Sequence, residues 1–167
     1  VALLIAPAFV NQFLVPDIAA HYFVFYAAIL AGITPPIATA VAVACGIAES
    51  DFWGTAFEAI KIAGPLFILP FAFIYNPEIV SGEFNQSNLF VGTITLLGAI
   101  AIIHGLNYQF NINRIGQYAF RGAFFGTGVV AMAHPETMIQ ISALGVAVFL
   151  FIVQNVSAIR QPSPTTE

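Results

Sequence analysis

A short run, Gly32-Ile33-Thr34-Pro35-Pro36, interrupts an otherwise apolar stretch of the chain. Its two consecutive prolines supply no backbone N–H, and the first one disfavours helical geometry at Thr34. The carbonyl oxygens of this run and the hydroxyl groups of Thr34 and Thr39 are ligands that a hard cation prefers. Interrupted membrane helices bind sodium through such unwound carbonyl groups. The pattern therefore predicts a sodium site without a carboxylate, and the alternative interpretation is a simple kink in a membrane helix.

The break divides an uncharged stretch, residues 18–48, into two arms. Each arm is shorter than the roughly 20 apolar residues that span a bilayer. We therefore predict a re-entrant helical hairpin over residues 18–48 with its tip at the break. Asp17 is expected to cap the first arm, and Ser50 or Asp51 the helix that begins near Phe52, because a carboxylate or hydroxyl at this position accepts unpaired backbone N–H groups.

The composition places these elements in a membrane. The 167 residues include four Lys and Arg and eight Asp and Glu, so charged residues make up 7%, hydrophobic residues make up 59%, and the mean hydropathy is +0.91. A soluble domain carries roughly 25% charged residues, and this chain has too little polar surface to cover a core in water.

Four cations cannot form a basic patch, so no nucleic-acid partner is expected. The single Cys45 excludes a disulfide within the chain, and no Cys/His spacing typical of a metal site is present. We expect an all-α integral membrane protein.

Further helices are predicted downstream of the hairpin. Residues 52–75 begin amphipathic and become wholly apolar, with kinks expected at Pro65 and Pro70. Three more helices are predicted at about 89–106, 116–133 and 138–156, so that about four transmembrane helices accompany the hairpin. Gly122 and Gly126 predict close packing of two helices, because small residues four apart lie on one helix face.

The ends of the chain and its charges suggest its context. Residues 1–14 are predicted as the tail of a helix and residues 161–167 as a disordered tail. Because the sequence starts within an apolar stretch without a basic leader, we expect it to be the C-terminal piece of a longer protein. All four Lys and Arg residues fall on one side if the loops 76–88 and 134–137 lie on the other, and the positive-inside rule makes that side, and the C-terminus, cytoplasmic.

The stretch from His21 to Val80 also carries a resemblance. HYFVFYAAIL leads into ITPP, an Ala-rich arm ends in GIA, and FAFIYNP closes the next helix. In this order and spacing, residues 1–80 resemble the C-terminal part of the large membrane subunit of tripartite ATP-independent periplasmic (TRAP) transporters, and more narrowly the permeases with fused small and large subunits. Residues 88–160 resemble, more loosely, an extra C-terminal membrane segment of some fused permeases. Ala38 and Ala40 stand where many unfused subunits carry Gly and Asn, so the roles of those side chains do not carry over.

This resemblance implies part of an elevator-type secondary transporter of the bacterial inner membrane. Such a transporter is driven by sodium and imports small organic anions, such as dicarboxylates, that a periplasmic binding protein hands over. Its partners would be that binding protein, the remainder of the permease chain and the lipid bilayer. No cofactor or metal is expected apart from sodium as the coupling ion.

The resemblance also implies that the break is the tip of the second re-entrant hairpin. The residues expected near the ion are Gly32, Thr34, Pro35, Ile33 and Thr39. Those expected to contact substrate or to gate the site are Pro36 and His21.

Two other functions compete with transport. A membrane-embedded enzyme would use His21, His104 or His134 together with Glu58, and at least two of these groups would have to meet at one depth. No catalytic sequence motif connects them. A structural or scaffold subunit suits residues 88–160 taken alone. We expect a transporter component rather than an enzyme.

Overall fold

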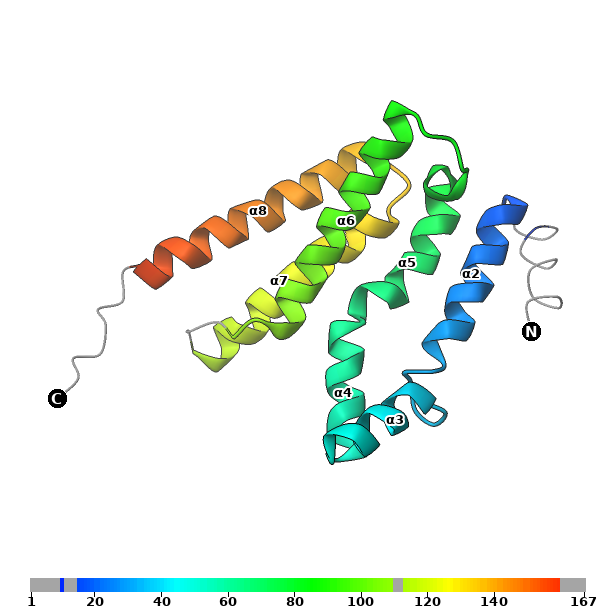
Figure 1. Cartoon of the computed structure of the whole chain (residues 1–167). Coiled ribbons are helices and arrows are strands. Elements are labelled where there is room, and N and C mark those ends of the chain that lie inside the picture. The colour runs from blue at the N-terminus through cyan, green and yellow to red at the C-terminus, as the bar shows by residue number, and fades with distance from the viewer. Residues whose placement is uncertain (1–9, 11–14, 110–112, 160–167) are drawn as a thin grey trace.

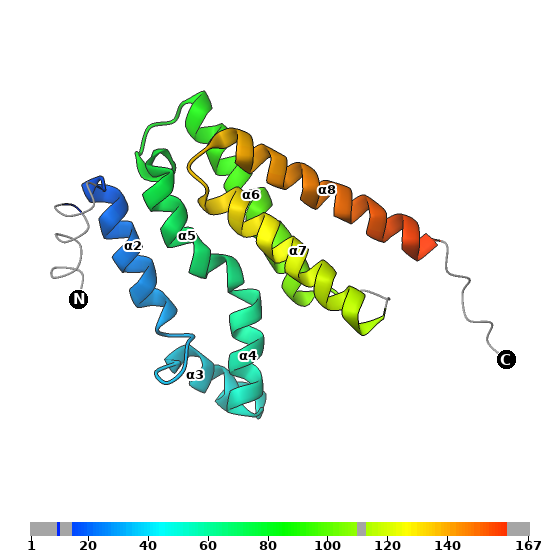
Figure 2. The same ribbon diagram turned by 180° about the vertical axis from the view of Figure 1, so that it is seen from behind.

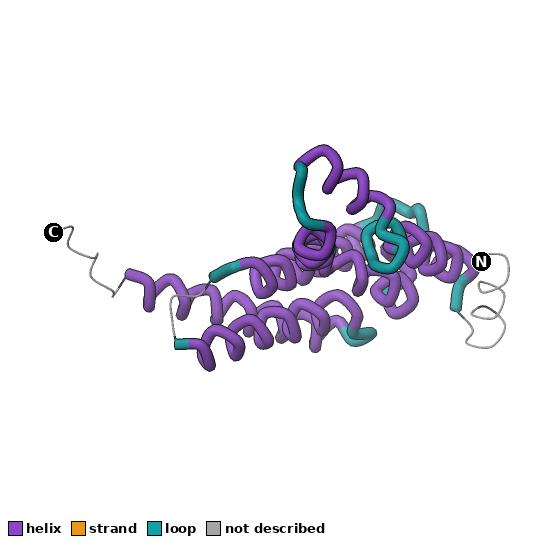
Figure 3. The backbone as a smooth tube through the Cα atoms, turned by 90° about the horizontal axis from the view of Figure 1, so that it is seen from below, coloured by secondary structure: helices purple, strands orange, loops and turns teal. Residues whose placement is uncertain are grey.

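The computed structural model describes residues 10, 15–109 and 113–159. All regular structure in these residues is helical (Figure 3), which confirms the predicted all-α class. The helices are α2 (Asp17–Leu30), α3 (Thr39–Ala48), α4 (Phe52–Ile62), α5 (Gly64–Tyr75), the short 3₁₀ helix η1 (Pro77–Val80), α6 (Gln86–Asn107), α7 (Arg114–Ala133) and α8 (Thr137–Ile159). The predictions for residues 1–14, apart from Val10, and for residues 161–167 lie outside the described residues.

Helix α5 occupies the centre of the molecule (Figures 1 and 2). It packs against α2 on one side and against α6 and α7 on the other, and α8 packs mainly on α7. The α2–α5 seam is apolar because Val24 and Phe73 are both buried there. Tyr22 and Tyr26 meet the Phe73 ring edge-on at centroid distances of 5.7 and 5.2 Å. The aromatic side chains of the first arm therefore pack, as such clusters usually do.

Helices α2 and α3 flank residues 31–38, so the predicted break is confirmed. The arms do not pair along their length, however, because α3 packs on α4 while α2 packs on α5. Figure 1 shows α3 lying across the end of the helix bundle. Ala38 precedes α3 in the left-handed conformation, with φ 38°, and is buried with Val41 against Ala56 of α4. The two arms therefore do not form a closed hairpin, because the chain turns after the break and α3 packs on α4. That the break enters the membrane stays a prediction.

The predicted helix over residues 52–75 consists of α4 and α5, which meet at an angle of 42°. Pro65 accounts for the bend, because it has no N–H to donate to the Lys61 carbonyl. In a straight helix, its ring would also clash sterically with that carbonyl. The kink expected at Pro65 therefore lies just before it, at Ala63. Pro70 is buried inside α5, which continues through it.

Two described helices, α6 and α8, are long and apolar enough to cross a membrane, and the bent α4–α5 pair would make a third. This is fewer than the four expected, because α7 is not among them. Helix α7 has 20 residues but carries Arg114, Gln117 and Arg121. It packs instead between α6 and α8, with Phe124 and Met132 buried.

The glycines that let α6 and α7 approach are not the predicted pair. A Cβ on Gly128 would lie 2.6 Å from the Gly98 carbonyl oxygen, and one on Gly105 would lie 2.8 Å from a side-chain atom of α7. Both distances are shorter than a real Cβ tolerates, so these positions require glycine. A Cβ on Gly122 or Gly126 would meet nothing within 4 Å. The prediction of close packing at Gly122 and Gly126 is therefore wrong.

The two predicted aspartate caps also have different outcomes. The Asp51 carboxylate accepts the Gly54 N–H at 2.7 Å, which confirms it as the cap of α4. Asp17 is instead the first residue of α2, Pro16 occupies the cap position, and no side-chain cap hydrogen bond forms. The predicted cap at Asp17 is wrong because the helix begins one residue earlier than expected.

Candidate functional site: the interrupted helix pair

The backbone leaves α2 through a tight turn. The N–H groups of Gly32, Ile33 and Thr34 donate to the carbonyls of Ile29 and Leu30 at 3.0 to 3.1 Å. The chain therefore winds one further turn beyond the end of α2. The polar groups of this turn are largely paired before the prolines begin.

The far side of the break folds back on this turn. The Ala38 N–H donates to the carbonyls of Ala31 and Thr34 at 3.2 and 3.0 Å, and the Ala40 N–H donates to the Gly32 carbonyl at 2.9 Å. The carbonyl oxygens of Gly32 and Thr34 are thus already used within the chain. These bonds give the break a defined shape.

Four carbonyl oxygens at the break, those of Ile33, Pro35, Pro36 and Ile37, accept no hydrogen bond from the described residues. The bond between the two prolines is cis. Buried or membrane-embedded carbonyls need a partner, because an unsatisfied one costs several kcal/mol in lipid. An ion that prefers oxygen ligands would satisfy them.

Two threonine hydroxyl groups belong to the same stretch of chain, one within the break and one directly after it. Thr34 Oγ1 donates to the Leu30 carbonyl at 2.7 Å, which uses its proton and leaves its oxygen lone pairs for a cation. Thr39 Oγ1 lies 3.8 Å from the point where a Cβ on Gly32 would stand. The fold therefore brings Gly32 and Thr39 together from opposite sides of the break. Gly32 through Pro35 are half-buried, whereas Pro36 and Thr39 are exposed.

His21 is not part of this cluster. It lies in the second turn of α2, and its Nδ1 is 2.7 Å from the Asp17 carbonyl oxygen. His21 precedes Leu30 by nine positions, which is about 14 Å along the helix. The structure therefore separates His21 from the other predicted site residues.

The groups proposed for an enzyme each have their own local contacts. His104 Nε2 lies 2.9 Å from Gln154 Oε1, His134 Nδ1 accepts the Glu136 N–H, and Glu58 pairs with Lys61 on α4. Across the described ranges, no three His, Cys, Asp or Glu side chains are grouped as metal ligands would be. Each of these groups is therefore bonded to a residue other than its proposed catalytic partners.

Sequence reasoning missed a buried amide network at one end of α5. The Gln140 side chain is 0% exposed, and its Nε2 donates to Asn76 Oδ1 at 3.1 Å and to the His134 carbonyl at 2.6 Å. Asn76 Nδ2 in turn donates to the Met132 carbonyl at 3.4 Å. A glutamine within the apolar first turns of α8 was the available signal. This network joins the end of α5 to the α7–α8 turn.

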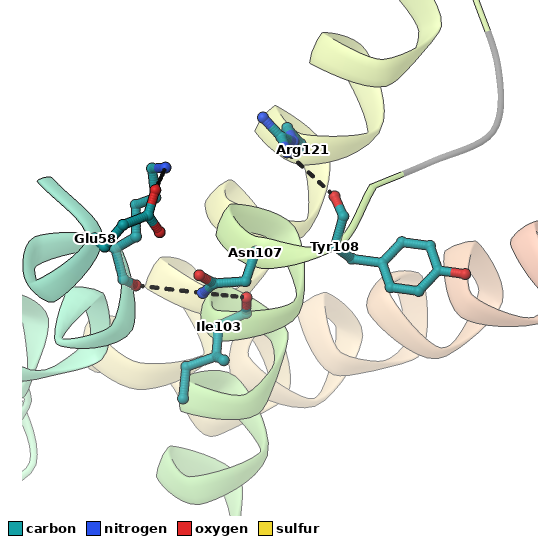
Figure 4. Close-up of polar contacts among 6 residues, drawn as sticks. Glu58, Ile103, Asn107, Tyr108 and Arg121 are labelled. Carbon is teal, nitrogen blue, oxygen red and sulfur yellow. Dashed lines mark hydrogen bonds and ion pairs between the residues drawn. The ribbon is translucent and has the colours of Figure 1, made fainter. Parts of the chain in front are cut away.

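A second polar contact lies at the other end of α5 (Figure 4). Asn107 Nδ2 donates to the Lys61 carbonyl at 3.4 Å and to the Ile103 carbonyl at 3.0 Å. The Lys61 carbonyl is the one that Pro65 cannot pair. The Asn107 side chain of α6 thus donates a hydrogen bond to the Lys61 carbonyl, which has lost its usual helical donor at the bend.

The first part of the chain is similar to a known protein family. Residues 1–79 match a family described as Tripartite ATP-independent periplasmic transporter, DctM component. No curated protein and no solved structure matches the chain. The matched stretch contains the break and helices α2 to α5, whereas α6 to α8 lie beyond it.

Proposed function

With residues 1–79 belonging to the DctM family, the large permease component of TRAP transporters, we propose that the break at residues 31–38 binds the sodium ion that drives uptake. The chain is then part of a sodium-coupled secondary transporter of small organic anions. A periplasmic binding protein would deliver the substrate, and the remainder of the permease would complete the pathway. The proposed setting is the bacterial inner membrane, with the C-terminus in the cytoplasm.

One observation supports the ion site most strongly. The carbonyls of Ile33, Pro35, Pro36 and Ile37 have no hydrogen-bond donor among the described residues, and Thr34 and Thr39 add two hydroxyls to the same stretch of chain. These are neutral oxygen ligands, so a bound cation adds its own charge to the site. A positive charge at this point would favour a carboxylate substrate nearby. This is a physical reason for the coupling of a cation to an organic anion.

The test uses the complete permease that contains this chain. Gly32→Leu combined with Thr34→Ala should lower binding of radioactive sodium at least tenfold, because the leucine enters the space next to the Ile29 carbonyl and Thr39 and a hydroxyl ligand is lost. Uptake of labelled succinate into liposomes, with binding protein and a sodium gradient, should fall in parallel. Replacing sodium with choline should abolish uptake by the unaltered protein.

The matched control is Gly46→Leu on α3, where an added Cβ meets nothing within 4 Å. It should bind sodium and transport as the unaltered protein does. Unchanged sodium binding in the Gly32/Thr34 variant would show that the ion lies elsewhere. Uptake that persists in choline would disprove sodium coupling itself.

A separate role is proposed for residues 81–160. Helices α6, α7 and α8 are continuous, and α6 and α7 pack on α5. Asn107 of α6 bonds to the Lys61 carbonyl at the end of α4, and Gln140 of α8 bonds to Asn76 at the end of α5. These features suit a scaffold that holds α5 rather than a second transport site. Exchanging α6–α8 for an unrelated three-helix segment should then reduce the amount of folded permease more than its affinity for sodium.

A further inference from the structure

An apolar groove of about 270 Å³ lies between α6, α7 and α8. Its lining includes Leu97, Ala101 and His104 of α6, Phe124 of α7, and Ala147 and Phe151 of α8. Among the described helices, α6 and α8 are the two that are long and apolar enough to span a membrane alone, and we therefore place the groove at the depth of lipid chains. It is partly open rather than enclosed, so a chain-like apolar ligand can enter from the side.

One end of the groove adjoins a cation. His104 lines the groove, and the Tyr108 ring stacks on it with centroids 4.7 Å apart. Arg121 Nη2 donates to the Tyr108 carbonyl at 3.3 Å (Figure 4). Tyr108 directly follows α6, so this end corresponds to the boundary between hydrocarbon and water. Arg121 is therefore linked to the groove through Tyr108 and His104.

The arginines of α7 have no acidic partner in their part of the chain. Residues 84–135 contain no Asp or Glu, and their only charged residues are Arg114 and Arg121. Seven residues separate the two arginines, which places them on one face of the helix two turns apart. The salt bridge found among the described residues is the one between Lys61 and Glu58. Within the same residues, the buried Arg121 Nε has no hydrogen-bond partner.

We propose that this groove binds one anionic phospholipid. One acyl chain lies in the groove, and the phosphate contacts the guanidinium groups of Arg121 and Arg114. Guanidinium groups bind phosphate through paired N–H donors, and basic pockets between membrane helices bind anionic headgroups. The positive-inside orientation places this lipid in the cytoplasmic leaflet.

The apolar groove and the two arginines of α7 together favour a phospholipid over other ligands. A small apolar molecule would fill the groove and leave the arginines without a counter-charge. A free phosphate ion would neutralise the arginines and leave the groove unfilled. A phospholipid satisfies both with one molecule, and its negative charge is complementary to a segment whose described charges are both positive.

The experiment measures lipid binding by the complete permease that contains this chain, purified in detergent, and it needs no transport. Spin-labelled phosphatidylglycerol and phosphatidylcholine report the fraction of lipid that the protein immobilises. The unaltered chain should retain phosphatidylglycerol preferentially. Arg121→Gln should lower that affinity about fivefold, and Arg114→Gln with Arg121→Gln about thirtyfold, as expected for two cations near a membrane surface.

Two variants separate the parts of the site. Ala147→Phe, which fills the groove, should weaken binding of both lipids, whereas Lys61→Gln, which removes a cation away from the groove, should change neither. Arg114→Gln is at an exposed position and tests the headgroup contact even if the other variants unfold, which thermal unfolding would reveal.

Equal retention of the two lipids, or unchanged retention in Arg114→Gln and the double arginine variant, would overturn the proposal. Complete displacement of the lipid by inorganic phosphate would also overturn it, because the acyl chain would then contribute nothing. Preferential retention that disappears with the arginines and with the filled groove would establish the site.

Discussion

The two parts of the chain use helices in opposite ways. In the family-matched part, no described helix exceeds the 14 residues of α2, and the path is broken at residues 31–38 and bent at Ala63. In the following part, α6, α7 and α8 run without interruption for 22, 20 and 23 residues. A continuous helix pairs its own backbone groups, whereas a broken one leaves some for other partners. The first part therefore leaves backbone carbonyl groups for other partners, whereas the long helices of the second part pair most of their own.

The largest expected loss of stability comes from a substitution where the continuous helices α6 and α7 pack together. Gly128→Ala should destabilise the protein by about 2 to 3 kcal/mol, because the new Cβ meets the Gly98 carbonyl at 2.6 Å and the Ile102 backbone N at 3.0 Å. Thermal unfolding in detergent measures the change. Gly126→Ala on the same helix is the control and should stabilise by up to about 1 kcal/mol, since its Cβ has open space. Equal effects at both positions would refute the Gly98–Gly128 seam.

The next effect loosens the contact between the two parts. Gln140→Leu should cost about 1 to 2 kcal/mol, because it deprives Asn76 Oδ1 and the His134 carbonyl of their donor in a buried setting. Asn155→Leu on the same helix should cost less, since Asn155 Nδ2 is exposed and donates only to Phe151 of its own helix. A double-mutant cycle between Asn76 and Gln140 should show coupling. Strict additivity would mean that the amide contact contributes nothing to the junction.

A smaller effect concerns the broken part alone. Asp51→Ala should cost about 1 kcal/mol by removing the N-cap of α4. Asp17→Ala should cost clearly less, because the Asp17 side chain caps nothing. Unfolding midpoints of the two variants give the comparison. A larger loss for Asp17→Ala would contradict the observed start of α2.

The smallest effect is expected at the surface of α4. Lys61→Gln should lower stability by only a few tenths of a kcal/mol, because the Glu58–Lys61 pair is largely exposed to solvent. High salt should reduce even this difference. A loss above about 1 kcal/mol would indicate that the lysine side chain contributes to the bend through more than this pair.

The sequence predicted features that depend on local chemistry. The break around Thr34-Pro35-Pro36, the cap at Asp51 and the bend near Pro65 all follow from missing N–H groups or from a side chain beside its own backbone. Such effects act within a few residues. The predicted residues Gly32, Thr34 and Thr39 are accordingly found together at the break, although their role as ligands stays a prediction.

Features that depend on partner helices were missed. Gly122 and Gly126 have the spacing of a close-packing pair, but the face of α7 that meets α6 is the one carrying Phe124 and Gly128. The spacing of small residues predicts which of them share a helix face, but it does not predict which neighbouring helix packs on that face. For the same reason, the sequence did not show that α3 packs on α4, or that Gln140 reaches Asn76 across the chain.

The contact between Asn107 and the Lys61 carbonyl has a consequence for biogenesis. The bend of α4–α5 lies within the family-matched residues, yet the amide that partners its carbonyl comes from α6, which the ribosome makes later. The bend therefore acquires this hydrogen bond only after α6 has followed α5 into the membrane. A polypeptide that ends before α6 would therefore lack this hydrogen bond to the Lys61 carbonyl.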